Sequence, residues 1–493
     1  MAKNDKNSFS NAFKATTIFG GVQVIVILFQ ILKSKAVAVL IGATGMGVLG
    51  LLTQTSSFIS ALTNFGLEAS AVKNISLAEA SGNKTYLYKT INVLQRLVIF
   101  TGTLGFLVCL ALSPFLSAIV FNNNNYITAF IIISISLLFI QLTAGQYAIL
   151  QGLRMTKLLA KVSIYNAVSG LLVSVPIYYF YGISGVAISI TVSALLNFLI
   201  TFYMTKKVKI KKVPFSKEIF NTEGRGMIKM GFLLSMSGLI SIGSSFLVRI
   251  FITRTGGVTD VGLYNAGFAI IEGYVGIIFT AMAKDYYPRL SMVSNNRIGR
   301  NREVNQQTEI AILLLIPVLT VFLLLLDFIV SILYTKEFLP SITMIQYAVL
   351  GMFLRAISWS MGYLLLAKGD SKIFFWSELI STMYVLGLNI LGYYFWGLKG
   401  IGIAFILIYF LHTLQIYYTT KLFYKFVFDK QLIKVFLIGT VLITVQFFII
   451  SEFEGILRYF IGSIVCLMGI IFSLKMLNDK INIYSFIKNK IKK

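Results

Sequence analysis

The sequence is poor in the residues that build catalytic and metal sites. It contains one histidine and two cysteines in 493 residues, and both cysteines, Cys109 and Cys466, lie in apolar runs. These numbers exclude a disulfide framework and a cysteine-based metal site. Walker A, HExxH and Cys/His patterns are absent. We therefore predict that the protein is not an enzyme, with no catalytic residue, no cofactor and no metal ligand.

Acidic residues are also scarce, because 18 Asp and Glu face 43 Lys and Arg and the formal net charge is +25. Charged residues make up 12% of the chain and hydrophobic residues 57%, whereas soluble domains are about 25% charged. The mean hydropathy is +0.84. This composition indicates an integral membrane protein whose basic excess lies in cytoplasmic loops, rather than a nucleic-acid-binding protein.

Apolar runs recur along the whole chain. A membrane-spanning helix needs roughly 20 apolar residues, and these runs do not alternate as barrel strands do. We therefore predict an all-α polytopic membrane protein with about fourteen transmembrane helices. They cover approximately residues 16–41, 45–68, 90–113, 126–150, 158–180, 183–205, 226–252, 260–283, 306–330, 340–367, 373–396, 399–424, 433–451 and 455–477.

The basic residues distinguish the two sides of the membrane. If both termini lie on one side, most of the 43 Lys and Arg fall in the loops and ends of that side. The loops of the other side are short and carry few basic residues, namely Arg254, Lys336, Lys399 and Arg458. By the positive-inside rule, the basic side and both termini are cytoplasmic.

The two halves of the chain resemble each other. Residues 177–188 (IYYFYGISGVAI) match residues 392–403 (GYYFWGLKGIGI) at an offset of 215, and the same offset pairs Thr44 with Thr259. A fixed offset across several spans indicates duplication. Each copy holds an even number of spans, so we predict two six-helix bundles related by a pseudo-two-fold axis along the membrane normal.

The duplication predicts four segments. Residues 1–205 form an N-terminal six-helix bundle, 206–225 a basic cytoplasmic linker, 226–425 a C-terminal six-helix bundle, and 426–493 two extra helices with a basic cytoplasmic tail. Two facing bundles enclose a cleft, and rocking one against the other gives alternating access. The tail INIYSFIKNKIKK is typical of an amphipathic surface helix.

Basic residues inside the spans are the candidates for lining this cleft. Each costs about 2.5–3.5 kcal/mol at mid-span on insertion scales, so compensation is expected. Lys and Arg bind phosphate, and amides bind sugars. For Lys35 and Arg249, snorkelling to the lipid head groups is the alternative. We predict a substrate-binding cavity lined by Lys33, Lys35, Arg249, Arg355, Gln30, Gln141 and Gln146.

Three further polar residues inside the spans are candidates for coupling transport to an ion gradient: Glu272, Asp327 and His412. For Glu272 the commoner alternative is a structural ion pair with Arg249 or Arg355. For His412, which titrates near neutral pH when unperturbed, it is a hydrogen bond in helix packing.

The most distinctive cytoplasmic segment is KDYYPRLSMVSNNRIGRNREVNQQTE, residues 284–309. Its five basic residues allow two interpretations, which are anchoring to anionic lipid or a gate for a phosphorylated substrate. The sequence does not decide between them.

Several motifs resemble one family. The segments KSKAVAVLIGATGMGVLGLL, LTNFGLEASAVKNIS, AMAKDYYPRLS and EVNQQTE are similar to those of Wzx-type O-antigen and polysaccharide flippases. That family belongs to the multidrug/oligosaccharidyl-lipid/polysaccharide exporter superfamily, in which two six-helix bundles surround a central cavity. The resemblance implies a flippase that moves an undecaprenyl-diphosphate-linked oligosaccharide, such as an O-antigen repeat unit, from the cytoplasmic to the periplasmic leaflet. It places the family's cationic cavity at Lys33, Lys35, Arg249 and Arg355.

The resemblance also implies the surroundings. We expect a multi-pass protein of the bacterial cytoplasmic (inner) membrane, in contact with membrane lipids, with glycan polymerase or ligase neighbours and no nucleic acid. The alternative is a drug/cation antiporter of the same superfamily, whose cavity should be dominated by carboxylates. A membrane glycan polymerase or ligase is the third interpretation, and the short external loops disfavour it.

Overall fold

The computed structural model describes residues 2–208, 210–211 and 224–481, and every regular element within these ranges is a helix. Eleven of the helical stretches are long and apolar enough to cross a membrane. The predicted all-α polytopic fold is thereby confirmed. Most of the expected linker and the expected surface helix of the tail lie outside the described residues.

Three of the eleven stretches are longer than one crossing requires. Ile25–Thr63 has 39 residues, Thr156–Lys206 has 51 and Ser371–Tyr424 has 54. Each is interrupted where two predicted spans meet, at Gly42, Gly182 and Gly397 respectively, all with positive φ. Because glycine lacks a Cβ, it adopts such backbone conformations at little cost. These breaks agree with paired spans, and the total of fourteen crossings stays a prediction.

The internal repeat is visible in the backbone itself. Positive φ recurs at an offset of 215 in three pairs of residues: Gly42 and Gly257, Arg154 and Gly369, and Gly182 and Gly397. In the last pair the φ,ψ angles are 54°, −135° and 56°, −140°. Agreement of both angles at the predicted offset supports duplication independently of side-chain identity.

The described chain forms two compact units. The first contains Met1–Gly262 and Leu333–Thr335, and the second contains Leu263–Ile332 and Lys336–Lys493. The sequence-based division into 1–205, 206–225, 226–425 and 426–493 stays a prediction.

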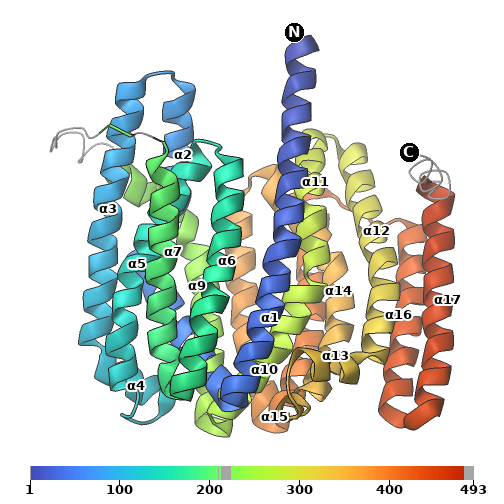
Figure 1. Cartoon of the computed structure of the whole chain (residues 1–493). Coiled ribbons are helices and arrows are strands. Elements are labelled where there is room, and N and C mark those ends of the chain that lie inside the picture. Colours follow the sequence, from blue (N-terminus) through green and yellow to red (C-terminus); the bar gives the residue numbers. More distant parts are fainter. Residues whose placement is uncertain (1, 209, 212–223, 482–493) are drawn as a thin grey trace, which may run out of the picture. The chain divides into compact units, whose positions relative to one another are not determined.

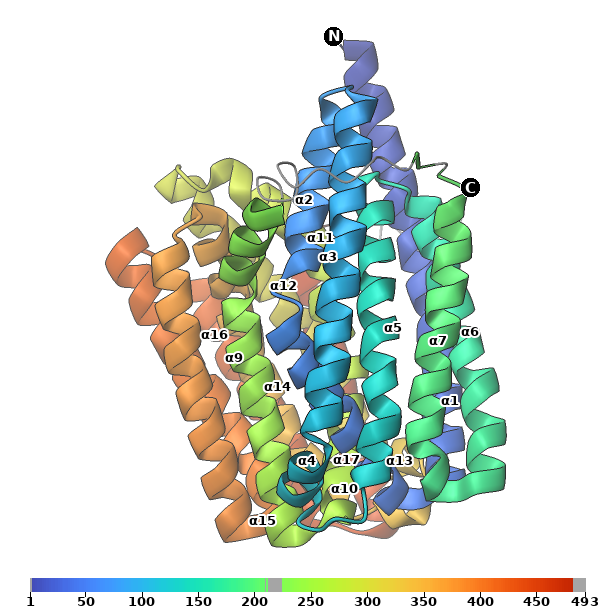
Figure 2. The same cartoon turned by 90° about the vertical axis from the view of Figure 1, so that its left-hand side faces the viewer.

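In the first unit, long helices pack along their lengths (Figure 2). Helix α5 contacts both α3 and α7, and α1 contacts both α6 and α9. The elements are α1 (Ala2–Thr63), α2 (Leu67–Ala80), α3 (Lys84–Ala111), α4 (Ser113–Phe121), α5 (Ile127–Gly152), α6 (Thr156–Tyr181), η1 (Gly182–Gly185), α7 (Val186–Lys206), α9 (Arg225–Gly256) and the start of α10 (Val258–Phe268), as far as Gly262. A Cβ at Gly66, which precedes α2, would lie 2.0 Å from the Gly231 carbonyl oxygen of α9. The contact between α2 and α9 therefore needs this glycine.

In the second unit, α12 packs against α14, α16 and α17, and α16 and α17 lie side by side (Figure 1). The elements after α10 are η3 (Ala269–Val275), α11 (Ile277–Val293), α12 (Arg297–Leu324), α13 (Leu326–Leu333), η4 (Lys336–Phe338), α14 (Ser341–Lys368), α15 (Ser371–Tyr424), α16 (Lys430–Glu452) and α17 (Gly455–Ile481). Helix α12 is the most buried of the membrane-length helices, with 72% of its apolar window covered. It is therefore the core of this unit.

Candidate functional site

A cavity of about 460 Å³ lies within the second unit, among η3, α11, α14 and α15. Its wall contains an arginine, two glutamates and the histidine of the chain: Arg355, Glu272, Glu378 and His412. A cavity that combines apolar walls with a few charged groups is the usual form of a small-molecule binding site. We take this cavity as the candidate site.

The main polar contact in the cavity wall is an ion pair between two helices. The Arg355 Nη1 on α14 donates to the Glu272 Oε1 on η3 at 2.6 Å. The side chains are 23% and 42% exposed respectively, so the pair lies at the edge of the cavity rather than inside the protein core. The structural ion pair that the sequence predicted for Glu272 is present, with Arg355 as its partner.

Aromatic rings hold the guanidinium in place. The Arg355 Cζ lies 5.5 Å from the centroid of the Phe279 ring and 5.4 Å from that of Tyr409. Both distances allow a cation–π contact. A long arginine side chain is thus fixed by two rings and one carboxylate, which reduces the entropy that it would lose when it binds an anion.

Glu272 sits in an unusual stretch of backbone. Element η3 is a π-helical turn, and the Gly276 amide donates to the Ile271 carbonyl, five residues earlier, at 2.9 Å. A Cβ at Gly276 would lie 2.3 Å from the Glu272 carbonyl oxygen, so the turn requires glycine there. Single π turns inside helices recur at functional sites.

His412 and Glu378 complete the charged and titratable wall of the cavity. His412 packs edge-on against Tyr409, with ring centroids 6.2 Å apart. Its Nδ1 is buried and has no hydrogen-bond partner among the described residues, so the predicted packing hydrogen bond is not present at this nitrogen. Both side chains come from α15, on opposite sides of its break at Gly397.

The other predicted basic residues lie in the first unit and make separate contacts. A Cβ built on Gly170 of α6 would lie 3.6 Å from the Lys33 Nζ. Lys35 donates to the Tyr334 carbonyl oxygen. The Arg249 Nη1 donates to the Ser245 carbonyl oxygen at 3.1 Å, within its own helix α9. Their assignment to one substrate cavity stays a prediction.

The predicted amides also lie in the first unit. Gln141 and Gln146 of α5 are buried, and Gln30 of α1 is exposed. Gln146 lines a second cavity of about 220 Å³ together with Gln95 and two phenylalanines of α7, Phe198 and Phe202. The structure thus places Gln146 in a cavity of its own unit, and its sugar-binding role stays a prediction.

Asp327, a candidate for ion coupling, forms an ion pair with Arg458. Its Oδ2 lies 2.7 Å from the Arg458 Nη1, which joins α13 to α17. The Arg458 guanidinium thus occupies one oxygen of this carboxylate. This contact gives Asp327 a structural role, and coupling through it stays a prediction.

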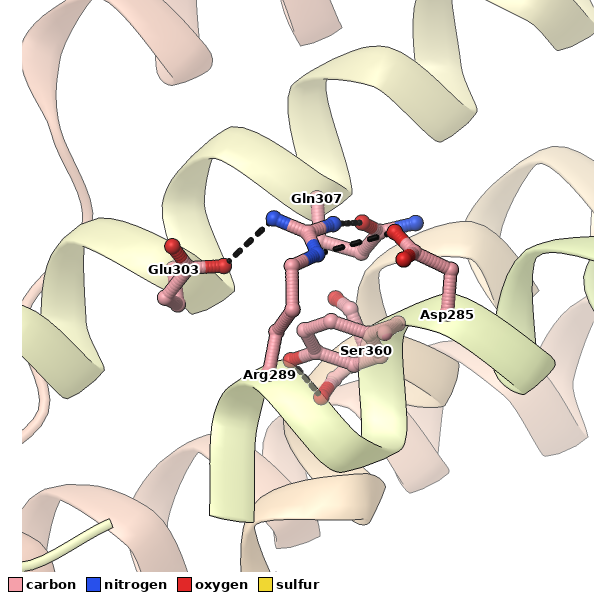
Figure 3. A network of polar contacts seen from close by, with 6 residues as sticks. Asp285, Arg289, Glu303, Gln307 and Ser360 are labelled. Carbon is pink, nitrogen blue, oxygen red and sulfur yellow. Dashed lines mark hydrogen bonds and ion pairs between the residues drawn. The ribbon is translucent and has the colours of Figure 1, made fainter. Parts of the chain in front are cut away.

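Segment 284–309 is held together by Arg289 (Figure 3). Its guanidinium donates to Asp285 and Glu303, each at 2.8 Å, and to Gln307 at 3.0 Å. In the same segment, the Tyr286 hydroxyl donates to the Ser360 carbonyl oxygen at 2.8 Å, and burial raises the pKa of that hydroxyl. The contacts join α11 to α12 and α14, so Arg289 serves the packing of the segment.

The aromatic part of the site carries no signal in the sequence. With 41 Phe and 25 Tyr in the chain, no pattern distinguishes Phe279 and Tyr409 from the rings that face lipid. Glu378, in contrast, could have been proposed as a site residue from the sequence, because an acidic residue inside an apolar run is itself a signal.

Comparisons with known structures agree on the fold. The lipid II flippase MurJ in an inward closed conformation superposes with a TM-score of 0.72 at 15% identity, covering 95% of this chain and 99% of that one. A multidrug resistance MATE family transporter of the MOP superfamily gives 0.68 at 14% identity, covering 87% and 98%. A MOP superfamily transporter from Pyrococcus furiosus gives 0.59 at 14% identity, covering 88% and 96%. At such identities the likeness shows the fold alone.

Comparison of the sequence with protein families identifies the family. No curated protein matches the chain. The family model described as polysaccharide biosynthesis protein matches residues 36–343, which is more than half of the chain. This match shows that the chain belongs to the polysaccharide biosynthesis protein family.

Proposed function

We propose that the protein is a flippase for a lipid-linked oligosaccharide with a diphosphate linkage. The sugar and diphosphate enter a polar cavity while the polyprenyl tail stays in the lipid. Alternating access then moves the head group from the cytoplasmic to the periplasmic leaflet of a bacterial inner membrane. Both termini are cytoplasmic in this proposal, by the distribution of basic residues.

The observation that carries the proposal is the position of Arg355. Its guanidinium lies at the wall of a cavity of about 460 Å³, inside an apolar helical unit where an idle charge would be costly. A guanidinium presents several N–H donors in a plane and binds phosphate oxygens in pairs. The family match and the flippase-like fold support a phosphate-bearing lipid as the ligand.

A second candidate function has one observation in its favour. Two carboxylates, Glu272 and Glu378, line the same cavity, and carboxylates are what a drug/cation antiporter of this fold would use. Expression in a pump-deleted host distinguishes the two, because an antiporter lowers drug susceptibility and a glycan flippase leaves it unchanged.

Depletion of the protein in its host tests the proposal directly. The lipid-linked oligosaccharide should accumulate in the cytoplasmic leaflet, and surface glycan should disappear. The charge-reversed double variant Lys33→Glu with Arg355→Glu should fail to restore export although it inserts normally. Arg302→Ala, which changes an exposed cytoplasmic arginine, is the matched control and should restore it. Normal surface glycan after depletion would refute the proposal.

A further inference from the structure

The Arg355–Glu272 pair has the geometry of an exchangeable contact. Among the described residues, the guanidinium bonds through Nη1 alone, to Glu272 at 2.6 Å and weakly to the Met352 sulfur at 3.8 Å. Arginine and carboxylate reach their strongest pairing with two parallel hydrogen bonds. The observed pair uses one, so Glu272 satisfies the charge of Arg355 without using its full donor capacity.

We propose that Glu272 is a placeholder that neutralises Arg355 in the empty cavity and gives it up to the diphosphate of the substrate. The inference rests on the proposed function for the identity of the anion. A diphosphate carries more negative charge than one carboxylate and offers paired oxygens to the guanidinium. A diphosphate should therefore bind the Arg355 guanidinium more strongly than Glu272 does.

The backbone around Glu272 permits the exchange. The carboxylate lies on the π turn η3, and two glycines, Gly273 and Gly276, follow it. A π turn holds one more residue than an α turn, so relaxing it rotates the side chains on it relative to the neighbouring helix. Glu272 is 42% exposed, and it can move toward water without crossing a packed core.

The rest of the cavity keeps Arg355 in place when Glu272 leaves. Phe279 and Tyr409 contact the guanidinium through their rings and offer no competing negative charge. The other carboxylate of the cavity wall, Glu378, is in none of the ion pairs between described residues. It repels an incoming anion through the general field of the cavity, whereas Glu272 also occupies the donor.

This difference between two glutamates in one cavity gives a matched test. Binding of inorganic pyrophosphate to the purified full-length protein is measured in detergent by calorimetry. Glu272→Gln should tighten binding on the order of tenfold, since it removes the competitor for Arg355. Glu378→Gln should tighten it much less. Arg355→Gln should abolish binding, and Glu272→Gln should not rescue it, because the two residues act as one unit.

Several outcomes would overturn the proposal. Equal gains from the two glutamine variants would show that only the net charge of the cavity matters. An unchanged or weaker affinity in Glu272→Gln would show that the carboxylate does not compete. If Glu272→Gln fails to fold, Glu272→Asp tests the same point, because a carboxylate one methylene shorter reaches Arg355 poorly and should also tighten binding.

Failure of the proposed function is distinguishable from failure of this inference. Without flippase activity on the lipid-linked oligosaccharide, the pyrophosphate series can still show exchange at Arg355. Conversely, normal glycan export together with no effect of Glu272→Gln on pyrophosphate binding would support the flippase function and contradict the exchange of Glu272 for the substrate.

Discussion

The hydroxyls of Thr44 and Thr259, two residues 215 positions apart, form a hydrogen bond at 2.8 Å. The residues around them follow the same pairing. A Cβ at Gly47 would lie 2.0 Å from the Val258 carbonyl oxygen, and a Cβ at Gly262 would lie 1.9 Å from that of Ala43. Each contact is the other shifted by the repeat offset, so the two copies of the duplicated sequence meet here in a self-complementary joint.

A cysteine at each of the two threonines should form a disulfide. The Oγ atoms are 2.8 Å apart, and small rotations bring two sulfurs to the bonding distance of about 2.05 Å. Maleimide labelling of the denatured double variant should count two fewer thiols after mild oxidation. The single variants Thr44→Cys and Thr259→Cys are controls and should keep their label. Because Cys109 and Cys466 also react after denaturation, two labelled thiols are expected after oxidation, and four would contradict the contact.

The same disulfide tests alternating access. If the joint must open while the head group crosses, the oxidised double variant should lose export and regain it after reduction. Undiminished export by fully oxidised protein would show that Thr44 and Thr259 stay together throughout transport.

The glycines of the joint should not tolerate a methyl group. Gly47→Ala and Gly262→Ala each place a Cβ about 2 Å from a carbonyl oxygen of the facing segment, so the backbones must separate. Overpacking of this kind costs about 1–3 kcal/mol, and the melting temperature in detergent should fall. Gly387→Ala on α15 is the matched control, since no other atom lies within 4 Å of its Cβ position. A control that loses as much stability would contradict the argument.

The sequence was sufficient to predict the parts of the fold that a lipid environment requires. Lipid requires long apolar helices, so composition and run length predicted the all-helical fold and the breaks near Gly182 and Gly397. Duplication preserved the offset, which identified Thr44 and Thr259 as equivalent positions of the repeat, whereas their contact is known only from the structure. The cost of a lone intramembrane charge predicted an ion-pair partner for Glu272, although Arg249 and Arg355 were equally good candidates before the structure.

The rest of the site depends on packing that one sequence does not encode visibly. In a soluble protein a buried ring stands out by its hydrophobic period, but here lipid-facing and cavity-facing rings are equally apolar. Phe279 and Tyr409 therefore carried no signal. The pairing of Asp327 with Arg458 was hidden for another reason, because it joins segments far apart in the chain that the repeat does not relate.

The Asp327–Arg458 ion pair should stabilise the protein mainly because it neutralises the buried guanidinium of Arg458. Arg458 is 14% exposed, and its Nε and Nη2 are buried without a partner in the described chain. Asp327→Asn leaves this guanidinium without its carboxylate and should cost about 1–3 kcal/mol, measured as a lower melting temperature in detergent. Arg458→Met added to Asp327→Asn should recover most of the loss, because removing both charges is nearly neutral. An additive loss in the double variant would contradict this.

Arg289 should stabilise segment 284–309 rather than receive substrate. It bonds with three acceptors at once, Asp285, Glu303 and Gln307, but its side chain is 39% exposed, so solvent reduces the gain. We expect Arg289→Ala to destabilise the protein by about 1–2 kcal/mol. Arg289→Lys should recover only part, because an ammonium is not a planar fork that reaches three fixed acceptors.

The neighbouring arginine gives the control that distinguishes packing from ligand binding. Arg302 is exposed, so Arg302→Ala should leave the melting temperature unchanged. If segment 284–309 were a gate for a phosphorylated substrate, Arg289→Ala would weaken pyrophosphate binding at an unchanged melting temperature. If Arg289 packs α11 against α12, the melting temperature falls and the affinity of the folded fraction stays the same. The three occupied acceptors favour the second result, since a guanidinium already bonded to two carboxylates has little capacity left for a phosphate.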